Sequence, residues 1–417
     1  MNIARTGFYT GIATAARLLA GLVAIKLVAW FAGPEGVGKL GQFMSLMSLL
    51  AVLAGGGIAA AVVKYVAEYR DQPQMLSRLL SAALWYAFCA SCLMGGVALL
   101  LSRQIASWLL GDPQYAGLIR VLAVAQLGIA LLNYVLAVIN GFMDVRRLAF
   151  IQVSGSVIGI VMMVWLARWL HLYGALLALV LSQVLWLLVG LPSWWRSSYF
   201  RRRMLQPHYD REMTSRLASF SVMTITSAVL PPLVNIAVRD HLALQFGWGR
   251  VGYWQAVSKV SDAYLLFLTT AINIHYLPKL ASTHGRAALM GELRDAYRYI
   301  LPAVVMLAAT VYVLRDRVTR LLFTPDFAAA NALYGPQLVG DVIKIASFIL
   351  SYLMLAKAMA KLFVISECVF AASYLVLVYV FVARFGLVGA MYAFAVNYLL
   401  YFVFTLLVAR HYLGGLR

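Results

Sequence analysis

The chain has 417 residues, of which 63% are hydrophobic and 12% charged, and its mean hydropathy is +0.85. Soluble domains are about 45 to 50% apolar and about 25% charged, so this composition excludes a soluble globular protein and predicts one that crosses a membrane many times. The formal net charge of +19 fits basic connectors that face anionic lipid, and nucleic acid is not needed to explain it.

Twelve apolar stretches are long enough, or nearly so, for a membrane-spanning helix, which needs about 20 residues. Alternating segments of about ten residues, the pattern of membrane β-barrels, are absent, so the predicted fold class is an all-α membrane protein. The first stretch lacks the cleavage site of a signal peptide, and we expect it to be retained. The predicted spans cover 8–32, 41–63, 79–101, 116–140, 148–169, 172–195, 217–239, 251–276, 299–314, 333–356, 362–383 and 387–409.

Lysine and arginine between the spans predict the orientation, because cytoplasmic connectors carry an excess of them. With the amino terminus in the cytoplasm, the inner connectors hold twice as many of these residues as the outer connectors. In this count Arg239 belongs to an outer connector. We therefore expect both termini in the cytoplasm. The basic run Arg201–Arg203, at mid-chain, is expected to contact lipid headgroups.

Short motifs recur in the two halves of the chain at nearly constant offsets. Residues 172–175 (LYGA) return as 387–390 (LVGA) at an offset of 215, and 37–38 (VG) return as 251–252 at an offset of 214. Six spans per half is an even number, so the halves have the same orientation, and a substrate site is expected between them. The predicted domains are an amino-terminal six-helix lobe (1–195), a basic cytoplasmic linker (196–216) and a carboxy-terminal six-helix lobe (217–417).

Three predicted spans carry polar residues at helical spacing, in steps of three, four or seven that place them on one face. Lipid cannot form hydrogen bonds with such groups, so each stripe must face another helix or water. The stripes comprise Gln126, Asn133 and Asn140 in the fourth span; Gln255, Lys259, Asp262 and Asn273 in the eighth; and Gln337, Asp341 and Lys344 in the tenth. We predict that these residues line a substrate cavity.

Two explanations stay open for the charged members of the stripes. Lys259 with Asp262, and Asp341 with Lys344, are spaced i,i+3, so each pair could neutralise itself and only hold helices in register. A cavity lining explains the whole stripe, whereas pairing explains only its charged members. Asp262 and Asp341 are also candidates for binding a coupling ion, H⁺ or Na⁺, because of their expected depth in the membrane.

The first span carries two further basic residues. Arg17 and Lys26 are nine residues apart, or about 180° around an ideal helix, so both can face one cavity only if the helix bends. Arg17 is the better cavity candidate, whereas Lys26 either lines the cavity or extends toward the membrane surface. Lys64, at the end of the second span, completes the basic candidates for substrate binding.

Helix-breaking residues interrupt two of the spans. Gly55, Gly56 and Gly57 fall within the second span, and Pro231 with Pro232 falls within the seventh. Broken helices in transporters mark hinges or binding sites, so these five residues are hinge candidates. Close helix packing is the alternative explanation for the glycines.

Several blocks resemble those of Wzx-type flippases, a branch of the multidrug/oligosaccharidyl-lipid/polysaccharide exporter superfamily: 33–38 (GPEGVG), 64–69 (KYVAEY), 254–255 (WQ), 261–265 (SDAYL) and 337–342 (QLVGDV). The resemblance implies a V-shaped, pseudo-twofold transporter of two six-helix bundles in the bacterial inner membrane. It would move an undecaprenyl-diphosphate-linked oligosaccharide, from enterobacterial common antigen or an O antigen, to the periplasmic leaflet by alternating access. Periplasmic polysaccharide polymerase machinery is an implied partner.

Two other functions are weighed against a flippase. A cation-coupled multidrug exporter of the same superfamily needs buried carboxylates, but the predicted lining holds more Lys and Arg, which suit a diphosphate. A membrane glycan polymerase or ligase needs catalytic groups on a sizeable outer loop, and no nucleophile-and-base constellation stands out. The six histidines lack metal-ligand spacing. The sequence therefore predicts a transporter without enzymatic activity, cofactor or metal.

Overall fold

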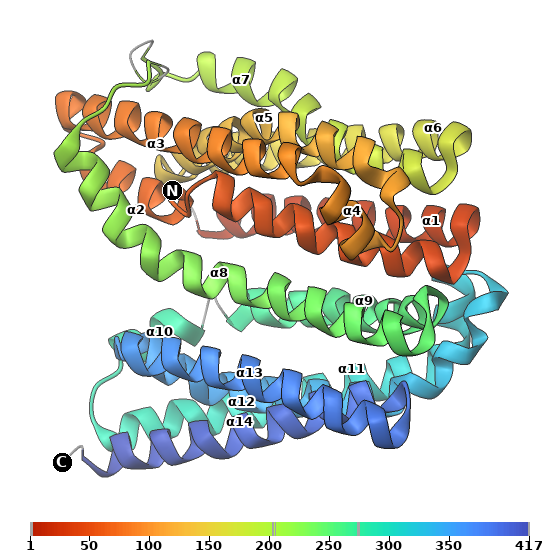
Figure 1. Cartoon of the computed structure of the whole chain (residues 1–417). Helices are drawn as coiled ribbons and strands as arrows, with labels where there is room; N and C mark the ends of the chain where they lie inside the picture. Colours follow the sequence, from red (N-terminus) through yellow and green to blue (C-terminus); the bar gives the residue numbers. More distant parts are fainter. Residues whose placement is uncertain (1–2, 202–203, 205, 273–275, 416–417) are drawn as a thin grey trace. The chain divides into compact units, whose positions relative to one another are not determined.

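The computed structural model describes residues 3–201, 204, 206–272 and 276–415 (Figure 1). All regular elements in these ranges are helices, as expected for a backbone that must satisfy its own hydrogen bonds in lipid. They are α1 (Ile3–Ala54), α2 (Ala59–Tyr69), α3 (Pro73–Leu100), α4 (Ser102–Leu110), η1 (Pro113–Tyr115), α5 (Ala116–Gly141), α6 (Val145–Leu185), α7 (Leu187–Trp195), α8 (Arg211–Phe246), α9 (Trp248–Ala271), α10 (Leu277–Ser282), α11 (Arg286–Leu322), η4 (Pro325–Leu333), α12 (Tyr334–Ala356), α13 (Ala360–Phe385) and α14 (Val388–Gly414).

The chain forms two compact units. Unit 1 comprises Met1–Ala32 and Lys39–Ile236, and unit 2 comprises Gly33–Gly38 and Ala237–Arg417. The long helix α8 therefore begins in unit 1 and ends in unit 2. The lobe boundaries expected at 195 and 216 stay a prediction about which parts of the chain move together.

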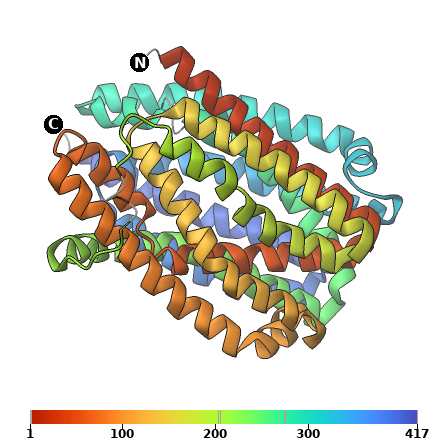
Figure 2. The same ribbon diagram turned by 90° about the horizontal axis from the view of Figure 1, so that it is seen from above.

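Each unit is built around one central helix. In unit 1, α5 packs against α2, α3, α6 and α7 (Figure 2). In unit 2, α12 packs against α9, α11, α13 and α14. These two helices carry the polar stripes predicted for the fourth and tenth spans, and a central position gives those polar groups neighbours other than lipid.

Eight helices in the described ranges are long and apolar enough to cross a membrane. They account for ten of the twelve predicted spans, because α1 holds the first span and most of the second, and α6 with α7 holds the fifth and sixth. The two remaining spans, 217–239 and 251–276, correspond to α8 and α9. The predicted polar stripe, with Lys259 and Asp262, lowers the hydropathy of α9.

The internal repeat is visible in the backbone. Positive φ angles occur in three pairs, Gly33 with Gly247, Met143 with Ala358 and His171 with Gly386, at offsets of 214, 215 and 215. The glycine of the repeated motif at 172–175 and 387–390 makes the same close backbone contact in each half. A Cβ atom at Gly174 would lie 2.0 Å from the carbonyl oxygen of Leu166, and one at Gly389 would lie 2.2 Å from that of Phe381.

The first connectors of the two halves pack against each other reciprocally. A Cβ atom at Gly38 would lie 2.8 Å from the carbonyl oxygen of Trp248, and one at Gly252 would lie 1.9 Å from that of Pro34. Gly38 and Gly252 are equivalent in the repeat, as are Pro34 and Trp248. Only glycine allows the two backbones to approach this closely.

We expect Gly252→Ala to lower the free energy of unfolding by roughly 1 to 3 kcal/mol, because the methyl group would overlap a backbone carbonyl that cannot rotate away. Gly249→Ala is the matched control on the same helix, since its Cβ atom would meet nothing within 4 Å. Thermal unfolding of both variants in detergent measures the difference. Equal stability would show that the contact between the connectors is loose.

His171 separates the two spans of α6 with φ 48° and ψ −128°, a region that glycine adopts far more easily than other residues. Gly386 holds the equivalent place in the second half. We expect His171→Gly to stabilise the protein by about 1 kcal/mol, because relief of strain exceeds the entropy that glycine loses on folding. His171→Ala keeps the strain and should give no gain in melting temperature. Equal melting temperatures for the two variants would contradict this account.

The linker is anchored to unit 1. The Tyr134 hydroxyl donates to the carbonyl oxygens of Met204 and Leu80, at 2.8 and 3.2 Å. The Tyr199 ring stacks on Phe142, with 4.0 Å between centroids. Arg201 is exposed, as expected for a residue that contacts headgroups, whereas Arg202 and Arg203 lie outside the described residues.

Asp210, just before α8, forms an ion pair with Arg78 of α3 and caps the start of α8. Arg78 lies 2.7 Å from a carboxylate oxygen of Asp210, and the other oxygen accepts from the backbone N–H groups of Glu212 and Met213. The hydrogen bond from Arg78 holds the pKa of Asp210 below its usual value. The start of α8 is therefore fixed to unit 1 by charge as well as by packing.

Candidate substrate site

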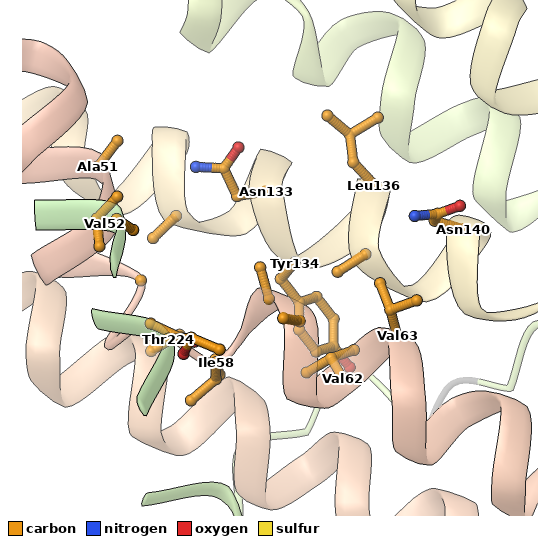
Figure 3. A pocket seen from close by; sticks show the side chains of 18 of the residues that line it. Ala51, Val52, Ile58, Val62, Val63, Asn133, Tyr134, Leu136, Asn140 and Thr224 are labelled. Carbon is orange, nitrogen blue, oxygen red and sulfur yellow. The ribbon is translucent and has the colours of Figure 1, made fainter. Parts of the chain in front are cut away.

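Unit 1 contains a cavity of about 520 Å³ between α1, α2, α5, α6 and α8 (Figure 3). Small-molecule sites usually measure about 300 to 1,000 Å³. Most of the lining is aliphatic, and its polar members include Asn133 and Asn140 of α5, Gln152 of α6 and Thr224 of α8. These amide and hydroxyl groups both donate and accept hydrogen bonds, so the cavity suits a neutral polar group.

The predicted break in the second span forms one wall of this cavity. α1 ends at Ala54 and α2 begins at Ala59, and Gly56 and Gly57 between them have φ angles of 61° and 66°. Side-chain hydroxyl groups donate hydrogen bonds to backbone carbonyls beside this break. Ser91 donates to the carbonyl oxygen of Ala54 at 3.0 Å, and Thr224 donates to that of Gly57 at 2.8 Å.

The glycines of this break are required by space as well as by conformation. A Cβ atom at Gly56 would lie 2.1 Å from the Tyr86 ring, and one at Gly57 would lie 2.3 Å from Ile225. Their role as a hinge stays a prediction. By contrast, α8 runs without a break through Pro231 and Pro232.

The stripe of the fourth span divides between two environments. Asn133 and Asn140 line the cavity, and Figure 3 shows them on the same side of α5 as Leu136. Gln126 is completely buried outside the lining, and its amide nitrogen and oxygen have no hydrogen-bond partner among the described residues. A buried polar group without a partner typically costs about 1 to 3 kcal/mol.

The basic candidates of unit 1 lie apart from this cavity. Arg17, Lys26 and Lys64 are all exposed, and none is in the lining. The Lys64 ammonium lies 5.0 Å from the centre of the Tyr65 ring. Their predicted contact with substrate stays a prediction.

A buried carboxylate lies at the centre of unit 2. Asp341 on α12 is 0% exposed. Its Oδ2 accepts from the hydroxyls of Ser261 and Tyr264 on α9, both at 2.5 Å, and its Oδ1 accepts from Gln337 at 3.0 Å. Three donors from two helices thus satisfy a group that would otherwise be expensive to bury.

Lys344 lies one turn away from Asp341 but has different neighbours. Its ammonium is 5.4 to 5.8 Å from the ring centres of Phe348, Phe394 and Tyr398, a cation–π arrangement. No ion pair between Asp341 and Lys344 occurs among the described residues. The direct ion pair that the i,i+3 spacing allows is therefore not formed here, and the role of these two charges stays a prediction.

The other predicted pair does form. The ammonium of Lys259 lies 3.1 Å from Asp262, and the two side chains are 29% and 59% exposed. Gln255, on the same stripe, is buried and accepts at 2.8 Å from Nε of Arg239. Asn273, the last member of the stripe, lies outside the described residues.

The sequence interpretation missed two charged residues of unit 2. Arg239 was assigned to an outer connector, but α8 continues to Phe246 and the side chain is 4% exposed, 5.3 Å from the Trp254 ring. Glu367 of α13, which accepts from the Tyr401 hydroxyl at 3.4 Å, belongs to no stripe. A predicted seventh span that ended beyond residue 239 would have placed Arg239 inside the helix instead of in a connector.

The sequence as a whole identifies the family. Residues 27–332 match the family model described as polysaccharide biosynthesis protein. The chain belongs to this family. This member is 34% identical to the lipid III flippase of Escherichia coli K12 over 402 residues, which cover 96% of this chain and 97% of that protein. The lipid III flippase of Shigella flexneri gives the same values. The resemblance to flippases of polysaccharide assembly is thus confirmed.

Solved structures show which fold this polysaccharide biosynthesis protein has. A multidrug resistance MATE family transporter of the MOP superfamily, in an inward-facing conformation, matches with a TM-score of 0.78 at 16% identity, over 96% of this chain and 95% of that one. A MOP superfamily transporter from Pyrococcus furiosus matches with a TM-score of 0.63 at 16% identity, over 99% and 95%. The predicted all-α membrane transporter fold is confirmed, whereas the cargo of those proteins is not transferred.

Tyr264→Phe removes one donor from the buried Asp341 carboxylate, so we expect the free energy of unfolding to fall by roughly 1.5 to 3 kcal/mol, the range for hydrogen bonds to charged groups. Tyr253→Phe is the control, because the described contact of Tyr253 is between its ring and Phe327. Denaturant unfolding in detergent compares the two variants. A loss no greater than that of Tyr253→Phe would mean that Asp341 does not depend on the network.

Proposed function

We propose that this protein is a flippase that moves an undecaprenyl-diphosphate-linked oligosaccharide across the membrane by alternating access. The observation that carries the proposal is the 34% identity to the lipid III flippase of Escherichia coli over nearly the whole of both chains. The cargo is lipid III of enterobacterial common antigen or a similar O-antigen unit. It moves from the cytoplasmic to the periplasmic leaflet of the inner membrane, and both termini of the protein lie in the cytoplasm.

The charged residues of unit 2 support an anionic cargo. Arg239 is almost completely buried, and the ammonium of Lys344 lies against three aromatic rings. Arg and Lys bind phosphate oxygens by charge-assisted hydrogen bonds, which are stronger where water is excluded. An isoprenoid tail can stay in lipid while only the head group crosses, so the transporter needs a polar interior for the head group alone.

The cavity of unit 1 supports a sugar head group. Its polar side chains, Asn133, Asn140, Gln152 and Thr224, are uncharged and offer both donors and acceptors, which matches sugar hydroxyls and amides. The aliphatic remainder of the lining suits the apolar faces of sugar rings. Gly55 and Gly57, which line this cavity, are the proposed hinge of the same wall.

A cation-coupled multidrug exporter remains the second candidate, because the solved structures share its fold. Asp341 is 0% exposed, so a bulky cationic drug has no access to this carboxylate. Asp262 and Asp341 remain the proposed sites for a coupling H⁺ or Na⁺. Polysaccharide polymerase machinery that consumes the cargo is a proposed partner.

Expression in a strain that lacks its lipid III flippase tests the proposal, with surface glycan as the measurement. We expect the chain to restore the glycan, and Lys344→Ala, Lys259→Ala and Arg17→Ala each to reduce its rate of appearance by about tenfold or more. This magnitude follows from the loss of one hydrogen bond to a charged group, about 1.5 to 3 kcal/mol, since 1.4 kcal/mol is a factor of ten.

Lys361→Ala is the control variant, because this exposed lysine lies at the start of α13, outside the predicted site. Membrane abundance of each variant is measured in parallel, so that loss of protein is not read as loss of transport. Full glycan recovery with all three site variants would show that the basic residues are structural. Drug resistance without glycan recovery would favour the exporter.

A further inference from the structure

A second cavity lies in unit 2, where α11 ends and α12 and α14 begin. Its volume is about 380 Å³, within the size range of small-molecule sites. Its polar and aromatic wall comprises Tyr312, Arg315 and Asp316 of α11, Asn331 of η4 and Tyr392 of α14. None of the stripe residues lines it, so this cavity is separate from the network around Asp341.

The amide and carboxylate of this wall are held in fixed orientations. The hydroxyl of Thr319, which is 3% exposed, donates to Oδ1 of Asn331 at 2.8 Å. Nδ2 of Asn331 then donates to Oδ1 of Asp316 at 2.5 Å. The Oδ2 atom of Asp316 has no hydrogen-bond partner among the described residues. An oriented carboxylate with an open acceptor atom is suited to a hydroxyl donor.

The guanidinium of Arg315 is also held in place. It lies 4.4 Å from the centre of the Tyr312 ring, and Nη1 donates to the Tyr312 carbonyl oxygen at 2.8 Å. The ring contact and the hydrogen bond hold the guanidinium in place and leave its other N–H groups for a planar anion such as a carboxylate. Because this side chain is already ordered, binding a ligand costs less conformational entropy than it would with a freely rotating arginine.

Two aromatic rings complete the wall. Tyr312 is 46% exposed and Tyr392 is 40% exposed. A Cβ atom at Gly335, which lines the same cavity, would lie 3.7 Å from the Tyr312 ring, so this ring rests on the start of α12. Exposed tyrosine rings combine an apolar face with a polar edge, which matches a sugar ring with its C–H face and hydroxyl edge.

We infer that this cavity binds a sugar residue that carries a carboxylate, with Arg315 on the carboxylate, Asp316 on a hydroxyl and the tyrosine rings against the C–H face. The inference rests on the proposed function, since the sugar would belong to the transported glycan. It adds a site for one sugar at an end of unit 2, separate from the cationic residues that suit the diphosphate.

Saturation-transfer NMR on the full-length protein in nanodiscs tests this site with D-glucuronic acid, D-glucose and inorganic phosphate as probes. We expect D-glucuronic acid to bind, and D-glucose and phosphate to bind about fivefold more weakly or worse, because each lacks one of the two features recognised. Arg315→Gln and Tyr392→Ala should each weaken D-glucuronic acid binding by about fivefold or more. Arg317→Gln, at an exposed arginine outside the lining, should leave it unchanged.

Three results would overturn the inference: no binding of D-glucuronic acid, equal binding of D-glucose or phosphate, or equal effects of Arg315→Gln and Arg317→Gln. Glycan recovery in the flippase-null strain separates this failure from failure of the proposed function. A chain that restores surface glycan but does not bind D-glucuronic acid is a flippase without this site. A chain that binds D-glucuronic acid but restores no glycan has this sugar site, and the proposed flippase function is then wrong.

Discussion

A backbone within lipid has to satisfy its hydrogen bonds from its own side chains and neighbouring helices, and this requirement determines where the chain can depart from a helix. The break at Gly55–Gly57 is possible because Ser91 and Thr224 donate to the carbonyls beside it. The cavity of unit 1 lies at this break. At this break, hydroxyl groups from α3 and α8 therefore replace hydrogen bonds that a continuous helix would make, and one of them, Thr224, also lines the cavity.

The two halves share a backbone plan but have divided the chemistry between them. At the repeat offset of 215, Gln126 of α5 corresponds to Asp341 of α12, and Ile129 corresponds to Lys344. Gln126 and Asp341 are both completely buried, yet only the second position carries a carboxyl group with three hydrogen-bond donors around it. The cavity of unit 1 is thus lined by uncharged polar groups, whereas unit 2 buries the ionisable side chains of Asp341 and Arg239.

Hydropathy and repeated motifs were sufficient to predict the helical class and the equivalence of the halves, because lipid imposes both length and apolarity on every span. The polar stripes predicted that Asn133, Asn140 and Asp341 lie away from lipid. Spacing could not decide whether Asp341 pairs with Lys344, because the competing donors Ser261 and Tyr264 lie about 80 residues away in the sequence. Arg239 was missed because a helix end in a polar sequence is poorly defined, and Glu367 because a single carboxylate forms no pattern.

Both α1 and α8 contribute residues to the two compact units, and in α8 the change falls between Ile236 and Ala237. Pro231 and Pro232 lie about one turn earlier and lack the backbone N–H groups that would stiffen this stretch. A continuous rod shared by two bodies transmits twist and bending from one to the other. In α8, the stretch that lacks two backbone N–H donors therefore lies within two turns of the residues where unit 1 ends and unit 2 begins.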